Sequence, residues 1–192
     1  MKKDFLIGLL IAFFLILLSF NILLNCNHFH KKLIEEYNDN PYFLEINKNV
    51  TKYITGLSSE LDVDFSDDEK SHMKDVRNLI LLEEFIFIIF SIAFFVLVYK
   101  RKIKINHIKK STLIIFFIGF LCIITSLFFN TFFKLFHLIF FPQGNWQFLP
   151  SSLMIQVYQQ SFFQNFFIAT IALSVFIALI IHLISMVINH PQ

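Results

Sequence analysis

The sequence predicts an all-α integral membrane protein with four transmembrane helices and a small extracytoplasmic cap between helices 1 and 2. Hydrophobic residues make up 56% of the 192 residues, and the chain contains 28 Phe but only four Gly and four Pro. This composition suits a lipid solvent and excludes a soluble domain. Because backbone groups in a bilayer must be hydrogen-bonded internally, long apolar segments are expected to be helices.

Four apolar segments are long enough to cross a hydrocarbon core of about 30 Å, which takes roughly 20 helical residues. They cover residues 5–24, 79–99, 113–133 and 166–188. The sequence Ser66-Asp67-Asp68-Glu69 precedes the second segment and is typical of a capping box, in which Ser and Glu side chains bind the first free amides of a helix. We therefore expect one continuous helix over residues 67–99 that includes the second span.

The distribution of Lys and Arg predicts that both termini are cytoplasmic, because cationic loops remain on that side of the membrane. Lys2 and Lys3 precede the first span, and the connection 100–112 is basic and contains no acid. Residues 27–78 instead carry seven basic and eleven acidic residues. We expect this segment outside, with residues 27–66 forming a cap that docks onto the helices because it is too small to bury a core alone.

The third connection, residues 134–164, has a different character. No Lys, Arg, Asp or Glu follows Lys134, and the segment is rich in aromatic residues. Aromatic side chains favour the boundary between membrane and water. We expect an extracytoplasmic interfacial loop here.

The beginning of the chain has an alternative interpretation, namely a lipoprotein signal peptide that ends at Cys26. Its apolar core is longer than a signal peptide needs, and Asn25 stands where a small residue is expected before a modified cysteine. We therefore expect residues 5–24 to remain as a membrane span.

Four of the seven histidines are predicted at the outer membrane surface: His28, His30, His72 and His137. His72 precedes the second span, and Asp75 shares its helix face at i+3, where a carboxylate can orient an imidazole. His137 lies in an apolar run in which a polar side chain needs a partner. Each could be a hydrogen-bonded interfacial histidine, but together they are a candidate acid/base couple, since an imidazole of pKa about 6.5 can accept and return a proton.

Two other interpretations stay open. A metal-binding protein could use His28 and His30 with His72, His137 and a carboxylate, although the spacing of His28-Phe29-His30 is not a rigid motif. A non-catalytic structural or regulatory membrane protein could instead bind a partner through its cap. No glycine-rich phosphate loop supports nucleotide binding.

Three segments resemble the bacterial lipoprotein intramolecular transacylase (Lit) family of four-span integral membrane proteins. They are Ser-His-Met-Lys-Asp-Val-Arg at 71–77, Phe-His-Leu-Ile-Phe-Phe at 136–141 and Gly-Asn-Trp-Gln-Phe at 144–148. The resemblance implies intramolecular acyl transfer from the sn-2 position of a lipoprotein's diacylglyceryl group to the α-amine of its N-terminal Cys, which forms the lyso-form lipoprotein. It also implies the bacterial cytoplasmic membrane, with the active site at the extracytoplasmic face.

The resemblance implies roles for individual residues as well. His72 and His137 would be the catalytic pair, Asp75 would orient His72, and Trp146 and Phe148 would help to form the substrate pocket. The partners would be the diacylglyceryl lipoprotein substrate and membrane lipid, with no nucleic acid. Neither a metal nor another cofactor would be required.

Overall fold

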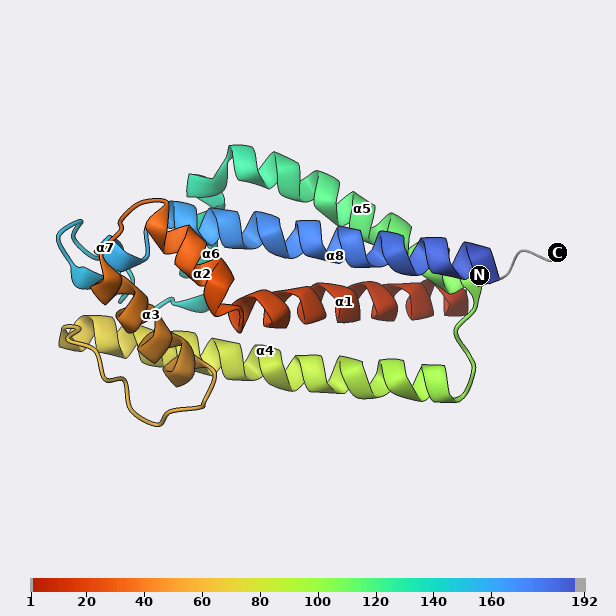
Figure 1. Ribbon diagram of the computed structural model, residues 1–192, viewed down its shortest axis with the longest axis horizontal. Coiled ribbons are helices and arrows are strands. Elements are labelled where there is room, and N and C mark those ends of the chain that lie inside the picture. Colours follow the sequence, from red (N-terminus) through yellow and green to blue (C-terminus); the bar gives the residue numbers. More distant parts are fainter. Residues whose placement is uncertain (1, 189–192) are drawn as a thin grey trace. The chain divides into compact units, whose positions relative to one another are not determined.

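The computed structural model describes residues 2–188, and within this range the chain forms eight α-helices and no strand (Figure 1). Residues 1 and 189–192 lie outside this description, and they include His190, one of the seven histidines. The bounds of the helices are α1 Lys2–Leu24, α2 Asn27–Glu35, α3 Pro41–Ile54, α4 Asp67–Tyr99, α5 Ile105–Leu127, α6 Phe129–Phe140, α7 Leu153–Val157 and α8 Gln160–Ile188.

The described residues fall into two compact units. The first comprises the described parts of Met1–Ile22, Phe85–Ile124 and Ile168–Gln192. The second comprises Leu23–Glu84 and Thr125–Phe167. Among residues 2–188, four helices, α1, α4, α5 and α8, are long and apolar enough to cross a membrane, as the sequence predicts.

Helix α4 covers Asp67–Tyr99 as a single helix, the range expected from the sequence. Its first turn is the predicted capping box: the Ser66 amide donates to Glu69 Oε2 over 2.8 Å, and the Glu69 amide donates to Ser66 Oγ over 3.3 Å. Asp67 and Asp68 also lie in this turn, where the positive end of the helix dipole favours acids.

The third and fourth spans, α5 and α8, differ from the expected ranges 113–133 and 166–188, and residues 134–164 are not simply a loop. Helix α5 ends at Leu127 because the backbone of Phe128 leaves helical geometry (φ −119°, ψ 33°), and α6 then begins at Phe129. Hydropathy does not detect this break, because Leu127, Phe128 and Phe129 at the break are all apolar. The segment 134–164 contains the end of α6, all of α7 and the start of α8.

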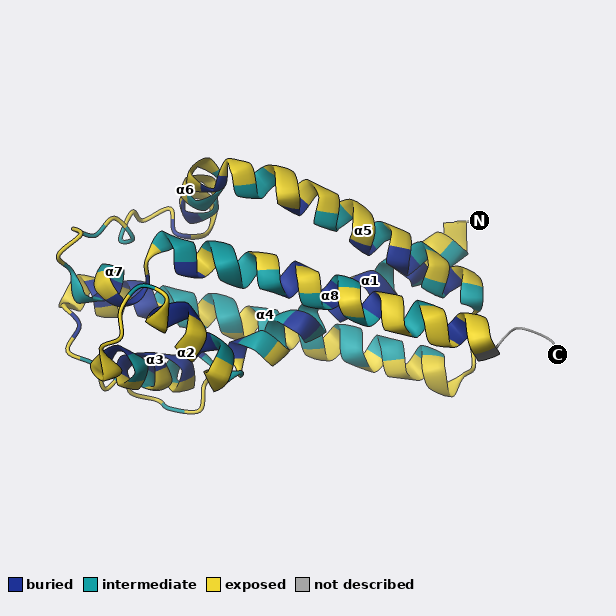
Figure 2. Ribbon diagram, turned by 45° about the horizontal axis from the view of Figure 1, so that its top comes forward, coloured by how far each residue is buried: buried dark blue, intermediate teal, exposed yellow. Residues whose placement is uncertain are grey.

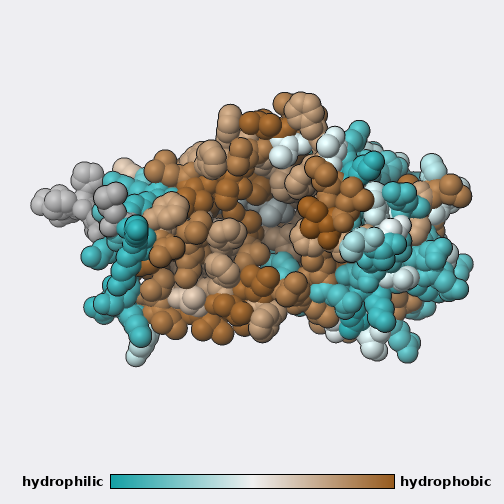
Figure 3. Space-filling model, turned by 180° about the vertical axis from the view of Figure 1, so that it is seen from behind, coloured by the Kyte–Doolittle hydropathy of each residue, from teal (hydrophilic) through white to brown (hydrophobic). Residues whose placement is uncertain are grey.

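The first unit has an apolar core that α1, α5 and α8 share. The buried members of this core are Ile11, Ala12, Phe14, Leu15, Ile115 and Ala178. Phe14 stacks on Phe94 of α4 with ring centroids 4.3 Å apart. Exposed residues recur along α5 and α8 in Figure 2, and many of them are large and apolar, as expected of side chains in contact with lipid (Figure 3).

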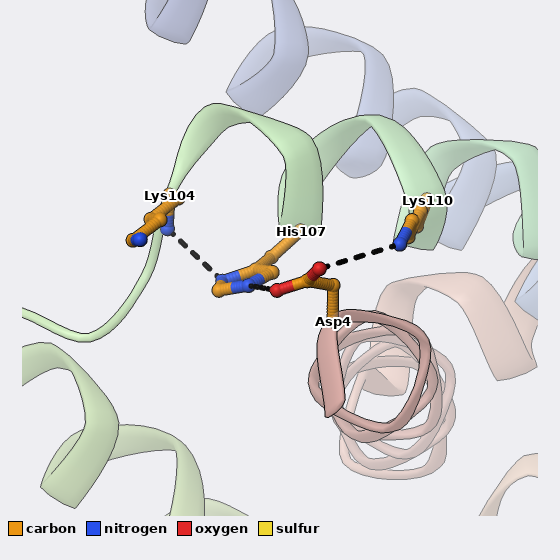
Figure 4. A network of polar contacts seen from close by, with 4 residues as sticks. All are labelled: Asp4, Lys104, His107 and Lys110. Carbon is orange, nitrogen blue, oxygen red and sulfur yellow. Dashed lines mark hydrogen bonds and ion pairs between the residues drawn. The ribbon is translucent and has the colours of Figure 1, made fainter. Parts of the chain in front are cut away.

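Polar contacts join the start of α1 to the start of α5 within the first unit. His107 Nε2 lies 3.0 Å from Asp4 Oδ1, and the Lys104 amide donates to His107 Nδ1 over 3.1 Å (Figure 4). Lys110 Nζ lies 3.9 Å from the other oxygen of Asp4. The two helices approach closely nearby, since a Cβ added at Gly8 would lie 2.8 Å from Lys110 Cβ and 3.3 Å from the His107 carbonyl oxygen.

The second unit contains a buried polar chain between α2, α3 and the residue that follows α7. Tyr158 Oη donates to Asn47 Oδ1 over 3.1 Å, and Asn47 Nδ2 lies 3.1 Å from His30 Nδ1. His30 is therefore a buried structural residue and does not face the outer surface, whereas His28 is exposed. Burial raises the pKa of Tyr158, so its hydroxyl stays protonated and acts as the donor.

Substituting Gly8 by Ala tests the close approach of α1 and α5. The new methyl group meets backbone and Cβ atoms, and such overpacking costs about 1 to 3 kcal/mol, which corresponds to a fall of several degrees in the thermal midpoint. Gly119→Ala is the matched control, because its Cβ would make ordinary contact with Ile171 at 3.6 Å. Thermal unfolding in detergent should show a fall for Gly8→Ala only, and equal midpoints would contradict the close approach.

Candidate active site

His72 and His137 come together in the second unit. His72 projects from α4 and His137 from α6, and their ring centroids lie 6.0 Å apart with the ring planes inclined by 25°. The residues are 6% and 8% exposed, respectively. Both imidazoles are therefore buried beside one another.

The tautomer of His137 follows from its local contact. Its Nδ1 lies 2.7 Å from the carbonyl oxygen of Phe133, one turn earlier in α6. A carbonyl oxygen only accepts, so Nδ1 carries the hydrogen and the free lone pair is on Nε2. Burial lowers the pKa of His137, and the Phe133 carbonyl opposes that effect. His137 is therefore a neutral proton acceptor near pH 7.

His72 is also neutral near pH 7. It lies in the polar first turns of α4, ahead of the apolar segment that begins at residue 79. Burial is the main cause that lowers the pKa of His72 to about 4, and the neighbouring His137 lowers it further. The charge of Asp75 and the side chain of Asn145 act in the opposite direction. Because a charge on one imidazole disfavours protonation of the other, the two rings are not both cationic near pH 7.

Asp75 acts on His72 by a less direct route than the sequence suggested. Its Oδ2 atom accepts hydrogen bonds from Gln143 Nε2 over 2.6 Å and from Asn145 Nδ2 over 2.8 Å. The side chain of Asn145 in turn interacts with His72 and raises its pKa. The orienting role of Asp75 stays a prediction, and its charge raises the pKa of His72 alongside the Asn145 side chain.

Aromatic rings surround the two histidines. Phe141 contacts both, with centroid distances of 4.8 Å to His72 and 5.4 Å to His137. Phe148 lies 5.7 Å from His72, and Trp146 lies 4.8 Å from His137. The two expected pocket residues thus each contact one histidine. These rings exclude water, which is the physical cause of the lowered pKa values of both histidines.

Two carboxylates of α4 hold the segment that carries Trp146 and Phe148. Glu69 is buried, and its Oε1 accepts the Met154 amide over 2.8 Å at the start of α7, while Asp75 accepts the two amide side chains at the other end of the segment. These carboxylates occupy positions i−3 and i+3 relative to His72, so all three share one helix face. This spacing could have been recognised in the sequence. From the sequence we predicted only a capping role for Glu69 and no role for Gln143.

Several buried polar atoms of the second unit lack a hydrogen-bond partner among the described residues. Four of them lie on His72 or on the segment 145–152: His72 Nδ1, Asn145 Oδ1, Trp146 Nε1 and Ser152 Oγ. Leaving such a group unpaired costs about 1 to 3 kcal/mol. Unpaired groups beside two histidines are what a site for a polar substrate group requires.

The alternative of a metal centre finds no ligand cluster in the part of the chain that the structure describes. Within residues 2–188, no group of three or more His, Cys, Asp or Glu side chains is arranged to hold a metal ion. His30 instead packs its ring against Phe162 and Phe166, with centroid distances of 5.9 Å to each.

Asp75→Ala should loosen the segment that carries Trp146. Two hydrogen bonds are lost, each worth about 1 kcal/mol at a partly exposed site. Trp146 is the single tryptophan of the chain, so its fluorescence reports on the segment directly. We expect a red-shifted emission and greater quenching by acrylamide. Asp68→Ala removes an exposed acid from the same helix and should leave both signals unchanged. An unchanged Asp75→Ala spectrum would show that Asp75 does not hold the segment that carries Trp146.

Comparisons with known proteins identify the family. The family model for lipoprotein intramolecular transacylase Lit matches residues 5–163, which include both histidines, Trp146 and Phe148. No curated protein matches the chain. The solved in meso structure of the membrane-integral lipoprotein intramolecular transacylase Lit from Bacillus cereus has a similar fold, with a TM-score of 0.72, 16% identity, and coverage of 97% of this chain and 95% of that one. Since the family model spans most of its length, the chain belongs to the lipoprotein intramolecular transacylase Lit family of membrane acyltransferases.

Proposed function

We propose that this chain transfers an acyl chain from the sn-2 oxygen of a lipoprotein's diacylglyceryl group to the α-amine of the N-terminal Cys of the same lipoprotein. The observation that carries the proposal is the histidine pair: two neutral imidazoles, 6.0 Å apart, in an aromatic site within a chain of this family. The products are an amide on the Cys and a free sn-2 hydroxyl, which together make the lyso-form lipoprotein.

The tautomer of His137 supports its role as the base. As the amine attacks the ester carbonyl, a C–N bond forms and the nitrogen becomes positively charged. His137 Nε2 accepts a proton from this nitrogen, and the C–O bond to the sn-2 oxygen then breaks. The same proton passes to the departing oxygen, so the reaction consumes neither water nor a further reactant.

His72 supports this proton transfer in two ways. Its own low pKa leaves the proton on His137, because two adjacent imidazolium ions would repel each other. Its ring packs against Phe141 and Phe148 and lies beside His137, where it can hydrogen-bond the departing oxygen. No acyl-enzyme is needed, since both reactants arrive on one molecule and tethering supplies a high effective concentration.

Charge supports the placement of this reaction at the extracytoplasmic face. The connection between α4 and α5 carries Lys100, Arg101, Lys102 and Lys104, and basic connections remain cytoplasmic. Each span crosses the membrane once. The acidic segment 27–78 lies between the first and second spans and is therefore expected on the opposite, outer side. A diacylglyceryl lipoprotein anchored in the outer leaflet would reach His72 and His137 from the lipid, and both termini of the enzyme would be cytoplasmic.

Mass spectrometry of a lipoprotein's N-terminal peptide tests the proposal. In a bacterium that lacks N-acylation, co-expression of the wild type should move one acyl chain from glycerol to the Cys amine. His137→Ala should lower the yield by 10²-fold or more, about the range that general base catalysis supplies, and His72→Ala should also lower it strongly. His28→Ala alters an exposed histidine and is the control. An unmodified substrate with folded wild type would contradict the proposal.

The dependence of the rate on pH provides a second test. The pKa of His72 is lowered to about 4 and that of His137 is lowered from the usual value of about 6.5, so any histidine limb is displaced to lower pH. The substrate amine, with an ordinary pKa of about 7.7 to 8.0, must lose its proton before it attacks. In single-turnover assays, kcat/KM should therefore rise between about pH 6 and pH 8 with the amine alone. A limb near about pH 6.5 would show that the histidines are not desolvated.

A further inference from the structure

We propose that the indole N–H of Trp146 donates a hydrogen bond to the carbonyl oxygen of the sn-2 ester and stabilises the oxyanion that forms when the amine attacks. Trp146 thereby becomes a third catalytic residue beside His72 and His137. The inference rests on the proposed acyl transfer, and its experiment includes a measurement that requires no turnover.

The first support is the state of the indole nitrogen. Trp146 Nε1 is buried and has no hydrogen-bond partner among the described residues. An indole nitrogen is a donor only, and an unpaired buried donor costs about 1 to 3 kcal/mol. A phenylalanine ring would pack at this place without that cost. Packing therefore explains an aromatic ring here but leaves the N–H unexplained.

The second support is the position of the ring. The centroid of Trp146 lies 4.8 Å from that of His137, with the planes inclined by 38°. The nitrogen that loses its proton to His137 Nε2 is bonded to the carbonyl carbon under attack, and the carbonyl oxygen is one bond away from that carbon. A donor that borders His137 is thus placed within reach of the developing oxyanion.

The third support is preorganisation. Asn145, the residue before Trp146, is held by Asp75 over 2.8 Å, and Met154 on the other side of the segment is held by Glu69 over 2.8 Å. A fixed donor in a site that excludes water needs no reorganisation when charge develops, so it stabilises the transition state more than the ground state. Loss of one such donor lowers kcat by about 10²- to 10³-fold.

The other unpaired groups of the site fit this role less well. The Asn145 Oδ1 atom only accepts, so an oxyanion would be repelled by it. The Ser152 hydroxyl can donate and is the rival donor. The Trp146 ring, however, directly contacts the His137 ring.

The chemical step is an ordinary addition and elimination. The amine nitrogen forms a bond to the carbonyl carbon, the carbonyl π electrons move to oxygen, and the resulting O⁻ accepts the Trp146 hydrogen bond. When the carbonyl re-forms, the C–O bond to the sn-2 oxygen breaks and that oxygen takes the proton from His137. Trp146 keeps its hydrogen throughout.

Replacement of Trp146 by β-(3-benzothienyl)alanine tests the N–H alone, because a sulfur replaces the nitrogen while the bicyclic shape is retained. We expect kcat to fall by about 10²- to 10³-fold with KM changed by less than about threefold. Ordinary Trp inserted at position 146 by the same suppression route is the control and should keep the wild-type kcat. A wild-type rate in the benzothienyl variant would overturn the assignment.

Infrared spectroscopy of a bound substrate separates this inference from the proposed function. The probe is a diacylglyceryl-cysteine peptide whose amine is acetylated, so that it cannot react, and whose sn-2 carbonyl carries ¹³C. The carbonyl band should lie at lower frequency on the wild type than on the benzothienyl variant. Equal frequencies would refute the Trp146 hydrogen bond, whether or not the enzyme transfers acyl chains, whereas a shift without turnover would refute only the transfer.

Discussion

The carboxylate of Glu69 is the contact on which the site depends most. One of its oxygens accepts the Ser66 amide and so begins α4, and the other accepts the Met154 amide and so docks α7. The same side chain therefore fixes the register of the helix that carries His72 and one end of the segment that carries Trp146. Buried carboxylates are costly unless every oxygen is hydrogen-bonded, and here both oxygens are.

Exclusion of water accounts for the chemistry that the site can perform. The aromatic rings around His72 and His137 keep both imidazoles neutral, and a neutral imidazole is the form that accepts a proton from an amine. Polar contacts then select the tautomer and the orientation: the Phe133 carbonyl fixes His137, and Asn145 acts on His72. The aromatic residues thus do more than face lipid, because they lower the proton affinity of the two histidines.

Much of this organisation could be predicted from the sequence, because it follows from local patterns. Hydropathy located four helices, the capping box located the start of α4, and the resemblance selected His72 and His137. Hydropathy failed between α5 and α6, where apolar residues continue through a break in the helix at Phe128. It also could not separate His30, which is buried against Asn47, from the exposed His28. Each of these failures concerns a contact between residues that are distant in sequence, or a backbone angle that composition does not encode.

The sequence by itself determined that the chain is a four-span membrane protein, where its long helix begins and which histidines are candidates, since periodicity, charge and capping act within a few residues. Only the tertiary structure decided that the free lone pair of His137 is on Nε2, that Asp75 holds Asn145, and that the indole nitrogen of Trp146 has no partner among the described residues. These features depend on side chains from α4, α6 and the following segment meeting in one place. Desolvation and hydrogen-bond pairing are properties of that meeting, and they do not exist in any one segment alone.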